Sequence, residues 1–322
     1  MKKYQRNHKR PPAWRGVVYY ARCLIRSRPR WLNIEVTKRC NAKCNFCGYW
    51  EEKSPPEIDD YSAAVKLFRP VVLSLSGGEP MIRRNLHEII KRLRPYAHYV
   101  AIVTNGTLLT EERAKELFDA GVDQLSVSLD FTDDTHDKMR GVPGLFAKIT
   151  KIVPELAAKG FNMAFNTVIM ETNLDHIVPL AKKSHEWGVG ISFSTYCPHK
   201  NDNHDHVMSP ENYEKLVSVI HEIKELKRAN RNVKNSDYYL GRIPEYVMNK
   251  GIPNCKAGIR WVQVTPDGYL QPCSELPRYC HFTEYSRKNI PIINCTKCWF
   301  ACRGEAEANP VGPKRLIELA KS

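Results

Sequence analysis

The sequence predicts an α/β protein with a parallel sheet, and three observations support this fold class. Six strand-like runs recur along the chain, beginning at Trp31, Val71, His98, Val122, Phe161 and Gly188. Helical patterns such as NLHEIIKRLRPY and TEERAKELFDAG separate the runs, and several of these patterns end in glycine, as helices often do. The two alternate at intervals of about 30 residues, which is typical of repeated βαβ units. Six units are fewer than a closed barrel of this kind contains.

Length and composition favour a folded protein that works in a reducing compartment. The 322 residues are 42% hydrophobic, which is enough for one large domain with a small appendage. No apolar run approaches the roughly 20 residues that cross a bilayer, and the basic start does not resemble a secretion signal. We therefore expect a cytoplasmic protein, in which eleven cysteines indicate metal binding or catalysis rather than disulfides.

Three regions follow from changes in composition. Residues 1–30 form an arm with ten Lys or Arg residues and no acidic residue, which explains most of the net charge of +14. Residues 31–250 contain the six strand–helix units and a long helix expected from about Ser209 to Asn230. Residues 251–322 are rich in cysteine and proline and lose the periodicity, so we place a boundary near Lys250.

The arm contains an amphipathic helical pattern. Its apolar positions are Trp14, Val17, Val18, Ala21, Leu24 and Ile25. The other face carries Arg15, Tyr19, Arg22 and Arg26. Such a helix can lie in the surface of an anionic membrane, which would make the protein peripheral, or pack across the bottom of the strands with its arginines in water. A nucleic-acid arm is a third reading, but no RNA-binding module accompanies it, so no nucleic acid is expected.

The stretch CNAKCNFC, residues 40–47, puts three thiols in the loop after the first predicted strand. In parallel α/β sheets, loops at the carboxyl ends of strands form the active site. Tetrahedral zinc normally needs a fourth protein ligand, and none lies nearby. Three thiolates on a four-iron cluster would instead leave one iron open. The alternative, three packing cysteines, fits a polar loop poorly.

These residues carry a resemblance to the radical S-adenosylmethionine (SAM) enzymes. The first motif is CxxxCxxC with the aromatic Phe46 before the last cysteine. SLSGGEP ends the second strand, TNGTLL ends the third, and SVSLDFTDDTHDKMRGVPGLF begins in the fourth and continues beyond it. Any one of these could be an ordinary turn or a helix cap, but four such motifs in register after four consecutive strands favour the family.

The resemblance implies an incomplete (β/α)6 TIM-like barrel that binds a 4Fe–4S cluster through Cys40, Cys44 and Cys47. SAM would bind at the strand ends, with its amino group held at the GGE motif, its ribose near Ser128 and Asp130, and its carboxylate near Arg140. The SAM-binding residues are then Phe46, Gly77, Gly78, Glu79, Thr104, Asn105, Ser128, Asp130 and Arg140. An electron from the cluster, supplied by a reductant such as flavodoxin or ferredoxin, would cleave SAM to a 5′-deoxyadenosyl radical. That radical would remove a hydrogen atom from the substrate, and the enzyme would be oxygen-sensitive.

A second cysteine set lies in the C-terminal region. Cys255 and Cys273 flank VQVTPDGY, which reads as a hairpin. The spacing of Gly268 and Cys273, followed by CTKCWFAC, resembles the SPASM and twitch domains of the same superfamily. The full SPASM pattern has more cysteines, so the twitch version with one auxiliary 4Fe–4S cluster is favoured. Its expected ligands are Cys255, Cys273, Cys295 and Cys298, with Cys302 as a reserve or a replacement. A structural zinc on the same thiols is the alternative.

The substrate is not readable from the sequence. A lipid-like molecule or a peptide is expected, and the arm is too short to hold a leader-binding domain of winged-helix type. The loop after the sixth strand, with Tyr196, Cys197, His199, His204 and His206, could contact substrate or simply be solvated. Tyr196 and Cys197 are the weak catalytic candidates. The alternative function is a non-enzymatic iron–sulfur redox sensor that binds nucleic acid through the basic arm.

Overall fold

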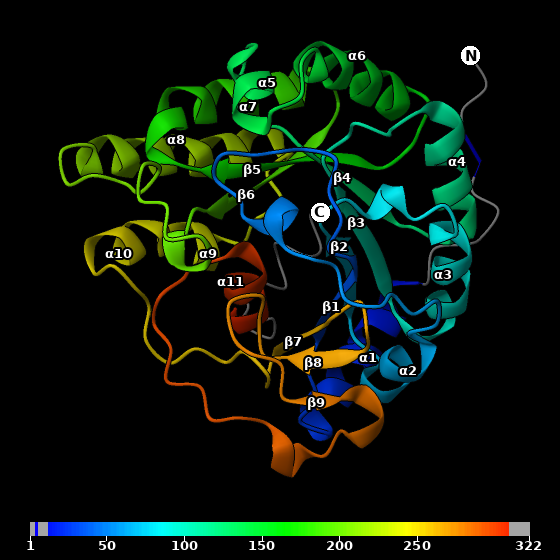
Figure 1. Ribbon diagram of the computed structural model, residues 1–322. Helices are drawn as coiled ribbons and strands as arrows, with labels where there is room; N and C mark the ends of the chain where they lie inside the picture. The colour runs from blue at the N-terminus through cyan, green and yellow to red at the C-terminus, as the bar shows by residue number, and fades with distance from the viewer. Residues whose placement is uncertain (1–3, 6–11, 309–322) are drawn as a thin grey trace.

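One sheet runs through both the barrel region and the C-terminal region (Figure 1). The computed structural model describes residues 4–5 and 12–308, and within them the strand order is β6-β5-β4-β3-β2-β1-β7-β8-β9. The barrel strands are β1 (Trp31–Thr37), β2 (Val72–Gly77), β3 (Tyr99–Thr104), β4 (Gln124–Ser128), β5 (Met163–Ile169) and β6 (Gly190–Thr195). Each pairs in parallel with its neighbour in sequence. The predicted α/β class is confirmed, as an incomplete (β/α)6 barrel.

Helices cover the outer face of these strands (Figure 1). They are α2 (Ser62–Phe68), α3 (Leu86–Leu93), α4 (Glu111–Ala120), α5 (Thr135–Arg140), α6 (Leu145–Ala158) and α7 (Leu174–Glu186). α4 illustrates how the sequence sets their ends. Thr110 Oγ1 accepts a hydrogen bond from the Arg113 backbone N–H at 3.1 Å, and Gly121 stops the helix with a φ of 122°. The glycine predicted to end this helix therefore does so.

The long helix α8 (Tyr213–Asn230) begins later than the sequence predicts. The expected start, Ser209, instead belongs to a turn held by the carboxylate of Glu171. That carboxylate accepts bonds from the backbone N–H and hydroxyl of Ser209, at 2.9 and 2.8 Å, and from the side-chain amide of Asn212. The helix therefore starts only after these side-chain contacts are complete.

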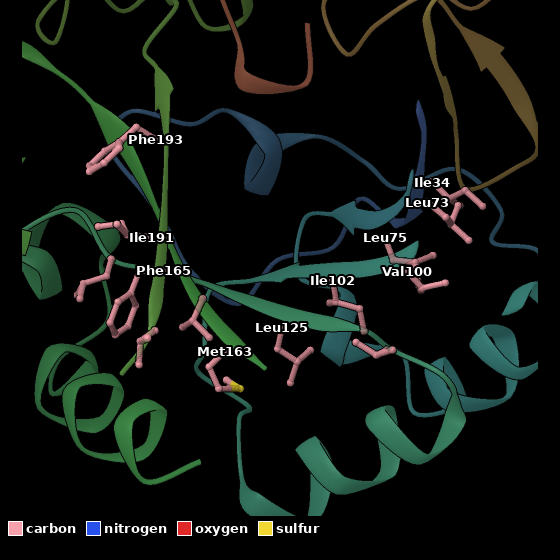
Figure 2. Close-up of a cluster of buried hydrophobic side chains, with 14 of the residues drawn as sticks. Ile34, Leu73, Leu75, Val100, Ile102, Leu125, Met163, Phe165, Ile191 and Phe193 are labelled. Atoms are coloured by element: carbon pink, nitrogen blue, oxygen red, sulfur yellow. The ribbon is translucent and has the colours of Figure 1, made fainter. Parts of the chain in front are cut away.

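The hydrophobic core lies between the strands and their helices. Along β1, Leu32, Ile34 and Val36 are fully buried and point outward to this layer. Figure 2 shows Ile34 together with core residues from β2 to β6, among them Leu75 and Phe193. Because side chains alternate along a strand, the remaining residues point to the other face.

That inner face of the barrel is polar. Its side chains bond to one another across the strands: Ser76 Oγ donates to Asn33 Oδ1 at 3.0 Å, and Ser192 Oγ donates to Asn166 Oδ1 at 3.1 Å. Its strand residues are mainly Ser, Asn and Gln, and include Asn33, Glu35, Ser74, Ser76, Gln124, Ser126, Ser128, Asn166, Ser192 and Ser194. Several of these are only partly buried. The barrel interior therefore offers many amide and hydroxyl groups, together with a few apolar side chains such as Val103 and Val168.

The C-terminal region continues the barrel sheet. β7 (Trp261–Val264) pairs in parallel with β1, and the predicted hairpin is formed by β7 and β8 (Tyr269–Gln271), followed by β9 (Cys280–His281). Gly268 takes a φ of 85° in the turn. Two short helices, α9 (Asp237–Gly241) and α10 (Ile243–Met248), precede this region, and α11 (Ala301–Glu307) ends it. The predicted boundary near Lys250 stays a prediction, since the sheet extends across it.

α11 lies between the two ends of the parallel barrel (Figure 1). Ser194 Oγ of β6 accepts a bond from the Ala301 backbone N–H at 3.2 Å, and Thr195 Oγ1 donates to the Trp299 carbonyl at 2.7 Å. On the other side, Arg30 Nε, just before β1, donates to the Ala306 carbonyl at 2.8 Å. The segment that carries the last cysteines therefore spans the open side of the barrel.

The predicted arm helix forms α1 (Ala13–Ile25), but it packs through an unexpected face. Tyr19 and Cys23 are buried, and the Tyr19 ring lies 5.9 Å from that of His98, at the amino ends of the strands. The apolar positions face solvent, with exposures of 65% for Trp14, 68% for Val17 and 84% for Ile25. The expectation that this face packs under the barrel is therefore wrong. The described residues exclude 1–3 and 6–11 of the arm and 309–322. Among the residues that are described, no helix is long and apolar enough to span a membrane.

Candidate functional site

The loop with Cys40, Cys44 and Cys47 is fixed from two sides at the carboxyl ends of the strands. The Arg39 carbonyl accepts a bond from the Glu79 backbone N–H at 2.8 Å. The Lys43 backbone N–H donates to the Arg140 carbonyl at 3.1 Å. The loop after β2 and the end of α5 therefore hold the three-cysteine loop in place.

Two of the three thiols have a polar donor beside the sulfur. The Asn105 side-chain amide lies 3.9 Å from Cys40 Sγ, and Arg140 Nη1 lies 3.9 Å from Cys44 Sγ. Burial raises the pKa of both thiols, and the positive charge of Arg140 opposes that shift at Cys44. Donors of this kind stabilise thiolates, the form that binds iron.

The donor set fits a 4Fe–4S cluster. No group of three or more His, Cys, Asp or Glu side chains in the described residues is arranged to hold a single metal ion. A four-iron cluster makes a different demand, because each thiolate binds its own iron atom and the sulfurs need not converge on one point. Three thiols in one loop, two of them beside donors, meet that demand.

Gly77 and Gly78 are required by close contact between two backbone segments. A Cβ atom at Gly77 would lie 2.0 Å from the Thr37 carbonyl oxygen, and Gly77 has a φ of 134°. A Cβ atom at Gly78 would lie 2.2 Å from the Arg39 carbonyl oxygen. The two glycines therefore let the β2 loop approach the cysteine loop closely. This backbone contact requires glycine even without a bound ligand.

Glu79 is fully buried and bonded within the protein. Its Oε1 accepts from Thr104 Oγ1 at 2.7 Å and from the Met81 backbone N–H at 3.0 Å, and its Oε2 accepts from the Asn105 backbone N–H at 2.6 Å. Burial raises its pKa, and these bonds oppose the shift. Glu79 thus joins the β2 loop to the β3 loop, and its contact with the SAM amino group stays a prediction.

Asp130 and Arg140 are brought together. Arg140 Nε and Nη2 both bond Asp130 Oδ2, at 3.0 and 2.5 Å, and the Arg140 guanidinium lies 5.1 Å from the centre of the Phe46 ring. The charge of Asp130 raises the pKa of Arg140 against the effect of burial. Ser128 is buried at the end of β4. The expected contacts of these residues with SAM stay predictions, and their mutual ion pair is a feature that the sequence does not predict.

The loop after β6 contacts both cysteine regions. Asn203 Nδ2 donates to the Asn45 carbonyl in the first cysteine loop at 2.9 Å, whereas Cys197 Sγ lies 3.4 Å from the Lys297 carbonyl. Tyr196 is buried, which raises its pKa to about 12, and its hydroxyl donates to the Asn203 carbonyl at 2.9 Å. His206 is buried edge-on between the rings of Phe46 and Tyr196. At His206, the reading of a solvated loop is wrong.

The C-terminal thiols gather at the segment that spans the open side. Cys255, Cys273 and Cys302 belong to one packed group that includes Trp261 and Ala306. Cys298 is buried, and Cys295 is partly buried. Burial raises the pKa of Cys273 and of Cys302 to about 12. Cys302, expected as a reserve, therefore lies with two of the expected ligands. Cys280 lies in the main core instead.

Two groups near these thiols escaped the sequence analysis. Arg303 is fully buried, bonds the carbonyls of Cys298 and Ile252 at 2.7 Å each, and pairs with Glu307 at 3.1 Å. His136 is also fully buried, which lowers its pKa to about 4. A lone Arg or His in a helix carries no signal of burial, so these residues could not be found from the sequence.

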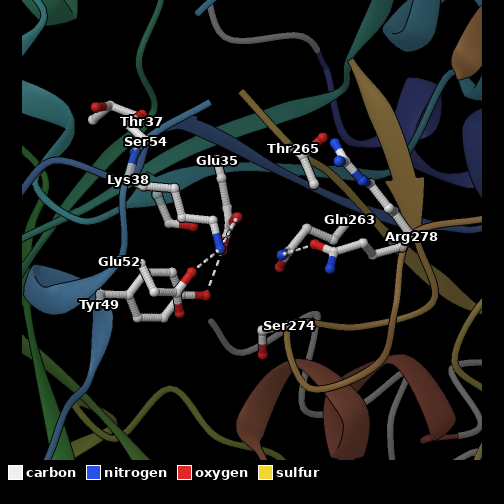
Figure 3. A network of polar contacts seen from close by, with 12 residues as sticks. Glu35, Thr37, Lys38, Tyr49, Glu52, Ser54, Gln263, Thr265, Ser274 and Arg278 are labelled. Atoms are coloured by element: carbon white, nitrogen blue, oxygen red, sulfur yellow. Dashed lines mark hydrogen bonds and ion pairs between the residues drawn. The ribbon is translucent and has the colours of Figure 1, made fainter. Parts of the chain in front are cut away.

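A third group, on the inner face of the barrel, consists of Glu35, Lys38, Tyr49 and Glu52 (Figure 3). Tyr49 donates its hydroxyl hydrogen to Glu35 Oε1, and Lys38 Nζ bonds Glu52 Oε2 at 2.8 Å. The alternation within WLNIEVT carries a signal for Glu35, because it places this residue on the face opposite Ile34. As the one charged residue of this strand run, Glu35 could have been singled out on that ground.

Comparison with known proteins agrees with this geometry. Residues 34–183 match the radical SAM superfamily. The AdoMet-dependent heme synthase of Methanosarcina barkeri is 27% identical in an alignment of length 272 that covers 77% of this chain and 78% of that protein. The PqqA peptide cyclase of Methylocella silvestris is 29% identical in an alignment of length 263 that covers 76% of this chain and 68% of that protein.

A solved structure shows the same fold. The crystal structure of Streptococcus suis SuiB bound to S-adenosylmethionine superposes with a TM-score of 0.65 at 16% identity, covering 83% of this chain and 67% of that one. The strand-end motifs, the barrel and these relatives agree, and the relatives named are enzymes, which excludes the redox-sensor alternative. The chain belongs to the radical SAM superfamily, and it is an enzyme that uses a 4Fe–4S cluster and SAM.

Proposed function

We propose that this enzyme reductively cleaves SAM and removes a hydrogen atom from a polar substrate held inside the barrel. The observation that carries the proposal is the contact of the three-cysteine loop with the β2 loop and with α5, both of which bear predicted SAM-binding residues. Bound together, the cluster and SAM supply a 5′-deoxyadenosyl radical. The protein residues bind and orient these two groups and keep water from the site.

The proposed roles follow the placement of the side chains. Cys40, Cys44 and Cys47 bind the cluster, and Arg140 and Asn105 stabilise its thiolates through the contacts at 3.9 Å. The SAM-binding residues are those named from the sequence: Phe46, Gly77, Gly78, Glu79, Thr104, Asn105, Ser128, Asp130 and Arg140. Because Arg140 contacts both Asp130 and Cys44, we propose that it links the cluster side of the site to the SAM side.

We also propose an auxiliary 4Fe–4S cluster on the C-terminal thiols, with Cys255, Cys273 and Cys298 as ligands and either Cys295 or Cys302 as the fourth. Burial of Cys255, Cys273 and Cys298 supports this set, and the packing of Cys302 beside the first two supports its inclusion. Burial raises the pKa of Cys255 and Cys298, and the positive charge of Arg303 opposes that rise, which favours thiolates there. Ligation by four thiolates would suit the cluster to electron transfer.

Polar groups on the inner face favour a polar reacting part of the substrate. Asn33, Ser76 and Gln263 are joined by hydrogen bonds at 3.0 Å on this face. Of the two expected classes, a peptide or a similar polar molecule therefore fits better than a lipid chain. The names of the relatives, a heme synthase and a peptide cyclase, allow either a small molecule or a peptide.

The first test measures SAM cleavage in the anaerobically reconstituted enzyme, with dithionite and then with flavodoxin or ferredoxin as reductant. We expect 5′-deoxyadenosine from the wild type and none from the triple variant Cys40→Ala/Cys44→Ala/Cys47→Ala. The triple variant should keep about four irons per chain on the auxiliary site. Cys280→Ala, which changes a core cysteine outside both sites, is the matched control and should keep both iron content and cleavage. Cleavage by the triple variant would refute the cluster assignment.

The exposed face of α1 supports attachment to an anionic membrane surface, which we propose as the location of the enzyme. Trp14, Val17, Val18, Leu24 and Ile25 are all more than half exposed. Arg15 on the same helix and Arg26 directly after it are exposed, and the arm carries no acidic residue. An apolar stripe with basic flanks is complementary to anionic lipid headgroups above acyl chains.

Vesicle sedimentation tests this location. The full-length wild type should sediment with phosphatidylglycerol vesicles in low salt and less with phosphatidylcholine vesicles. Val17→Ser/Leu24→Ser/Ile25→Ser should weaken the binding more than tenfold, because three apolar side chains no longer enter the lipid. The matched control is Met248→Ser/Ile292→Ser, which changes apolar residues that are equally exposed elsewhere. A wild type that stays in the supernatant with phosphatidylglycerol vesicles would refute the proposal.

A further inference from the structure

Glu35 is a buried carboxylate whose bonding is incomplete. It lies on β1 with no exposed surface, and its Oε1 accepts from the Tyr49 hydroxyl. Within the described residues, its Oε2 accepts no hydrogen bond. Lys38 Nζ forms an ion pair with that oxygen at 3.4 Å and lies closer to Glu52 Oε2, at 2.8 Å. Burying a carboxylate oxygen without a donor is costly, so a ligand that supplies the donor would be bound strongly.

Glu275 presents a second incompletely bonded carboxylate toward the same region. Its Oε2 is buried and accepts no hydrogen bond from the part of the chain that the structure describes, while its Oε1 accepts from Ser274 Oγ at 2.9 Å. Figure 3 shows Ser274 and Gln263 lying opposite the group formed by Glu35, Lys38 and Tyr49. The charge of Glu275 reaches Tyr49, as that of Glu35 does. The two carboxylates therefore both lie near Tyr49.

The amides of the inner face do not serve these carboxylates. Asn33 Nδ2 donates to Gln263 Oε1, Gln263 Nε2 donates to Gln271 Oε1, and Gln271 Nε2 donates to the Leu276 carbonyl, each at 3.0 Å. These donors are used in a ladder across β1, β7 and β8. The hydrogen-bond acceptors that stay unused here are the carboxylate oxygens of Glu35 and Glu275, which also leave an excess of negative charge.

The charge count points in the same direction. The ammonium of Lys38 pairs with two carboxylates, Glu35 at 3.4 Å and Glu52 at 2.8 Å, and a third carboxylate, Glu275, acts on the neighbouring Tyr49. Arg278, drawn nearby in Figure 3, pairs with Asp267 at 2.7 Å. This local excess of negative charge is not an effect of overall composition, because the net charge of the protein is +14.

The location is the place where a substrate must lie for the proposed function. Tyr49 follows Cys47 by two residues, so Glu35 borders the first cysteine loop. The charge of Glu275 adds to burial in raising the pKa of Cys273 and Cys302, so it borders the auxiliary thiols. The two carboxylates lie between the two cysteine sets.

We propose that Glu35 and Glu275 bind a cationic nitrogen of the substrate, an ammonium or a guanidinium group, inside the barrel. The inference rests on the proposed function, since it names the chemical class of its substrate. A cationic nitrogen supplies hydrogen-bond donors to the Oε2 atoms of both carboxylates and balances the excess negative charge. It would anchor the substrate between the two cysteine sets, so that a neighbouring carbon–hydrogen bond faces the SAM side.

Agmatine, which carries one ammonium and one guanidinium group, is a direct probe of this site. Its binding to the anaerobically reconstituted full-length enzyme with SAM can be followed by saturation-transfer NMR, with 1-pentanol as the neutral probe. We expect Glu35→Gln and Glu275→Gln each to weaken agmatine binding by about tenfold, the loss typical of one charge-assisted bond. Glu51→Gln is the matched control, because Glu51 is a solvent-exposed carboxylate in the same turn as Tyr49, and it should bind agmatine as the wild type does.

Thermal unfolding adds a readout that separates binding from structure. If Glu35 is kept for a ligand, removing its charge should leave the unfolding temperature of the substrate-free enzyme unchanged or raise it. If Glu35→Gln does not fold, Glu275→Gln carries the test, since Glu275 is only partly buried. Agmatine binding no stronger than that of 1-pentanol, or undiminished in the double variant, would overturn the inference. 5′-Deoxyadenosine formation in the same wild-type sample keeps the two claims apart: its presence without agmatine binding overturns only this inference, and its absence overturns the proposed function.

Discussion

Gly77→Ala is the substitution whose effect can be worked out most directly from the structure. The new Cβ would lie 2.0 Å from the Thr37 carbonyl oxygen, whereas real Cβ atoms keep at least 3.0 Å. The two backbone segments must therefore separate by about 1 Å. Two hydrogen bonds cross this contact, from the Gly78 N–H to Thr37 at 2.9 Å and from the Glu79 N–H to Arg39 at 2.8 Å. A separation of that size breaks both.

The magnitude follows from these parts. Each buried hydrogen bond contributes about 1 kcal/mol. Holding alanine at a φ of 134° costs a further ~1–3 kcal/mol. We therefore expect the free energy of unfolding to fall by about 3–5 kcal/mol, a large part of the stability of a typical domain. Because the displaced segment leads into Cys40, the iron content of the first site should fall as well.

Denaturant unfolding and iron analysis of the anaerobically purified protein check this expectation. Gly241→Ala is the matched control, since its Cβ would meet no heavy atom within 4 Å and Gly241 is helical. That variant should be unchanged or more stable by up to about 1 kcal/mol. If Gly77→Ala unfolds within about 0.5 kcal/mol of the wild type and retains full iron, the close-contact reasoning is refuted, and the glycine serves the ligand alone.

Three further substitutions address other parts of the site. Glu79→Ala should weaken SAM binding in calorimetry by about 1.5–3 kcal/mol, and unchanged affinity would leave Glu79 with only its bonds to Thr104 and Asn105. Arg303→Met should destabilise the protein by about 3 kcal/mol, because Glu307 loses its buried partner, and iron per chain should fall to about four; full iron content would contradict the thiolate-stabilising role. His136 has a pKa lowered from 6.5 to about 4, so it stays neutral in the folded state while the unfolded state takes up a proton. The free energy of unfolding should therefore fall by about 2 kcal/mol between pH 6.5 and pH 5 in the wild type, and His136→Gln should remove that part of the pH dependence; identical pH profiles would contradict the burial argument.

The strand ends could be predicted because their signals are local. A β-branched run followed by GGEP or TNG predicts both a strand and the residue at which it ends. The structure places these segments in neighbouring strands of one sheet. The hairpin of β7 and β8 was predictable for the same reason, from a turn that needs Gly268. The pairing of Asp130 with Arg140 could not be predicted in this way. Each residue was assigned a contact with SAM, and the two lie ten residues apart on different elements.

The orientation of α1 shows a different limit. The periodicity of Trp14, Val17 and Leu24 indicates an amphipathic helix, but it cannot say which face meets the protein. The structure packs the helix through Tyr19, Cys23 and Gly16, whose missing side chain leaves room for His98. Shape at the contact decided the orientation, and shape depends on residues distant in sequence. The same holds for Cys302, whose neighbours are distant in sequence: Cys255 precedes the β7–β8 hairpin and Cys273 follows it.

The segment around α11 connects the auxiliary thiols to the closure of the barrel. It bonds β6 through Ser194 and Thr195, and it bonds the start of β1 through Arg30. Cys298 and Cys302 lie in this segment, and their proposed partners Cys255 and Cys273 lie beside β7 and β8. A cluster that ties these thiols together would therefore also tie the first strand of the barrel to the last, and metal binding that couples distant segments contributes directly to folding free energy. Since the inner-face carboxylates border the same thiols, loading of the auxiliary site would help to enclose the substrate as well as to move electrons.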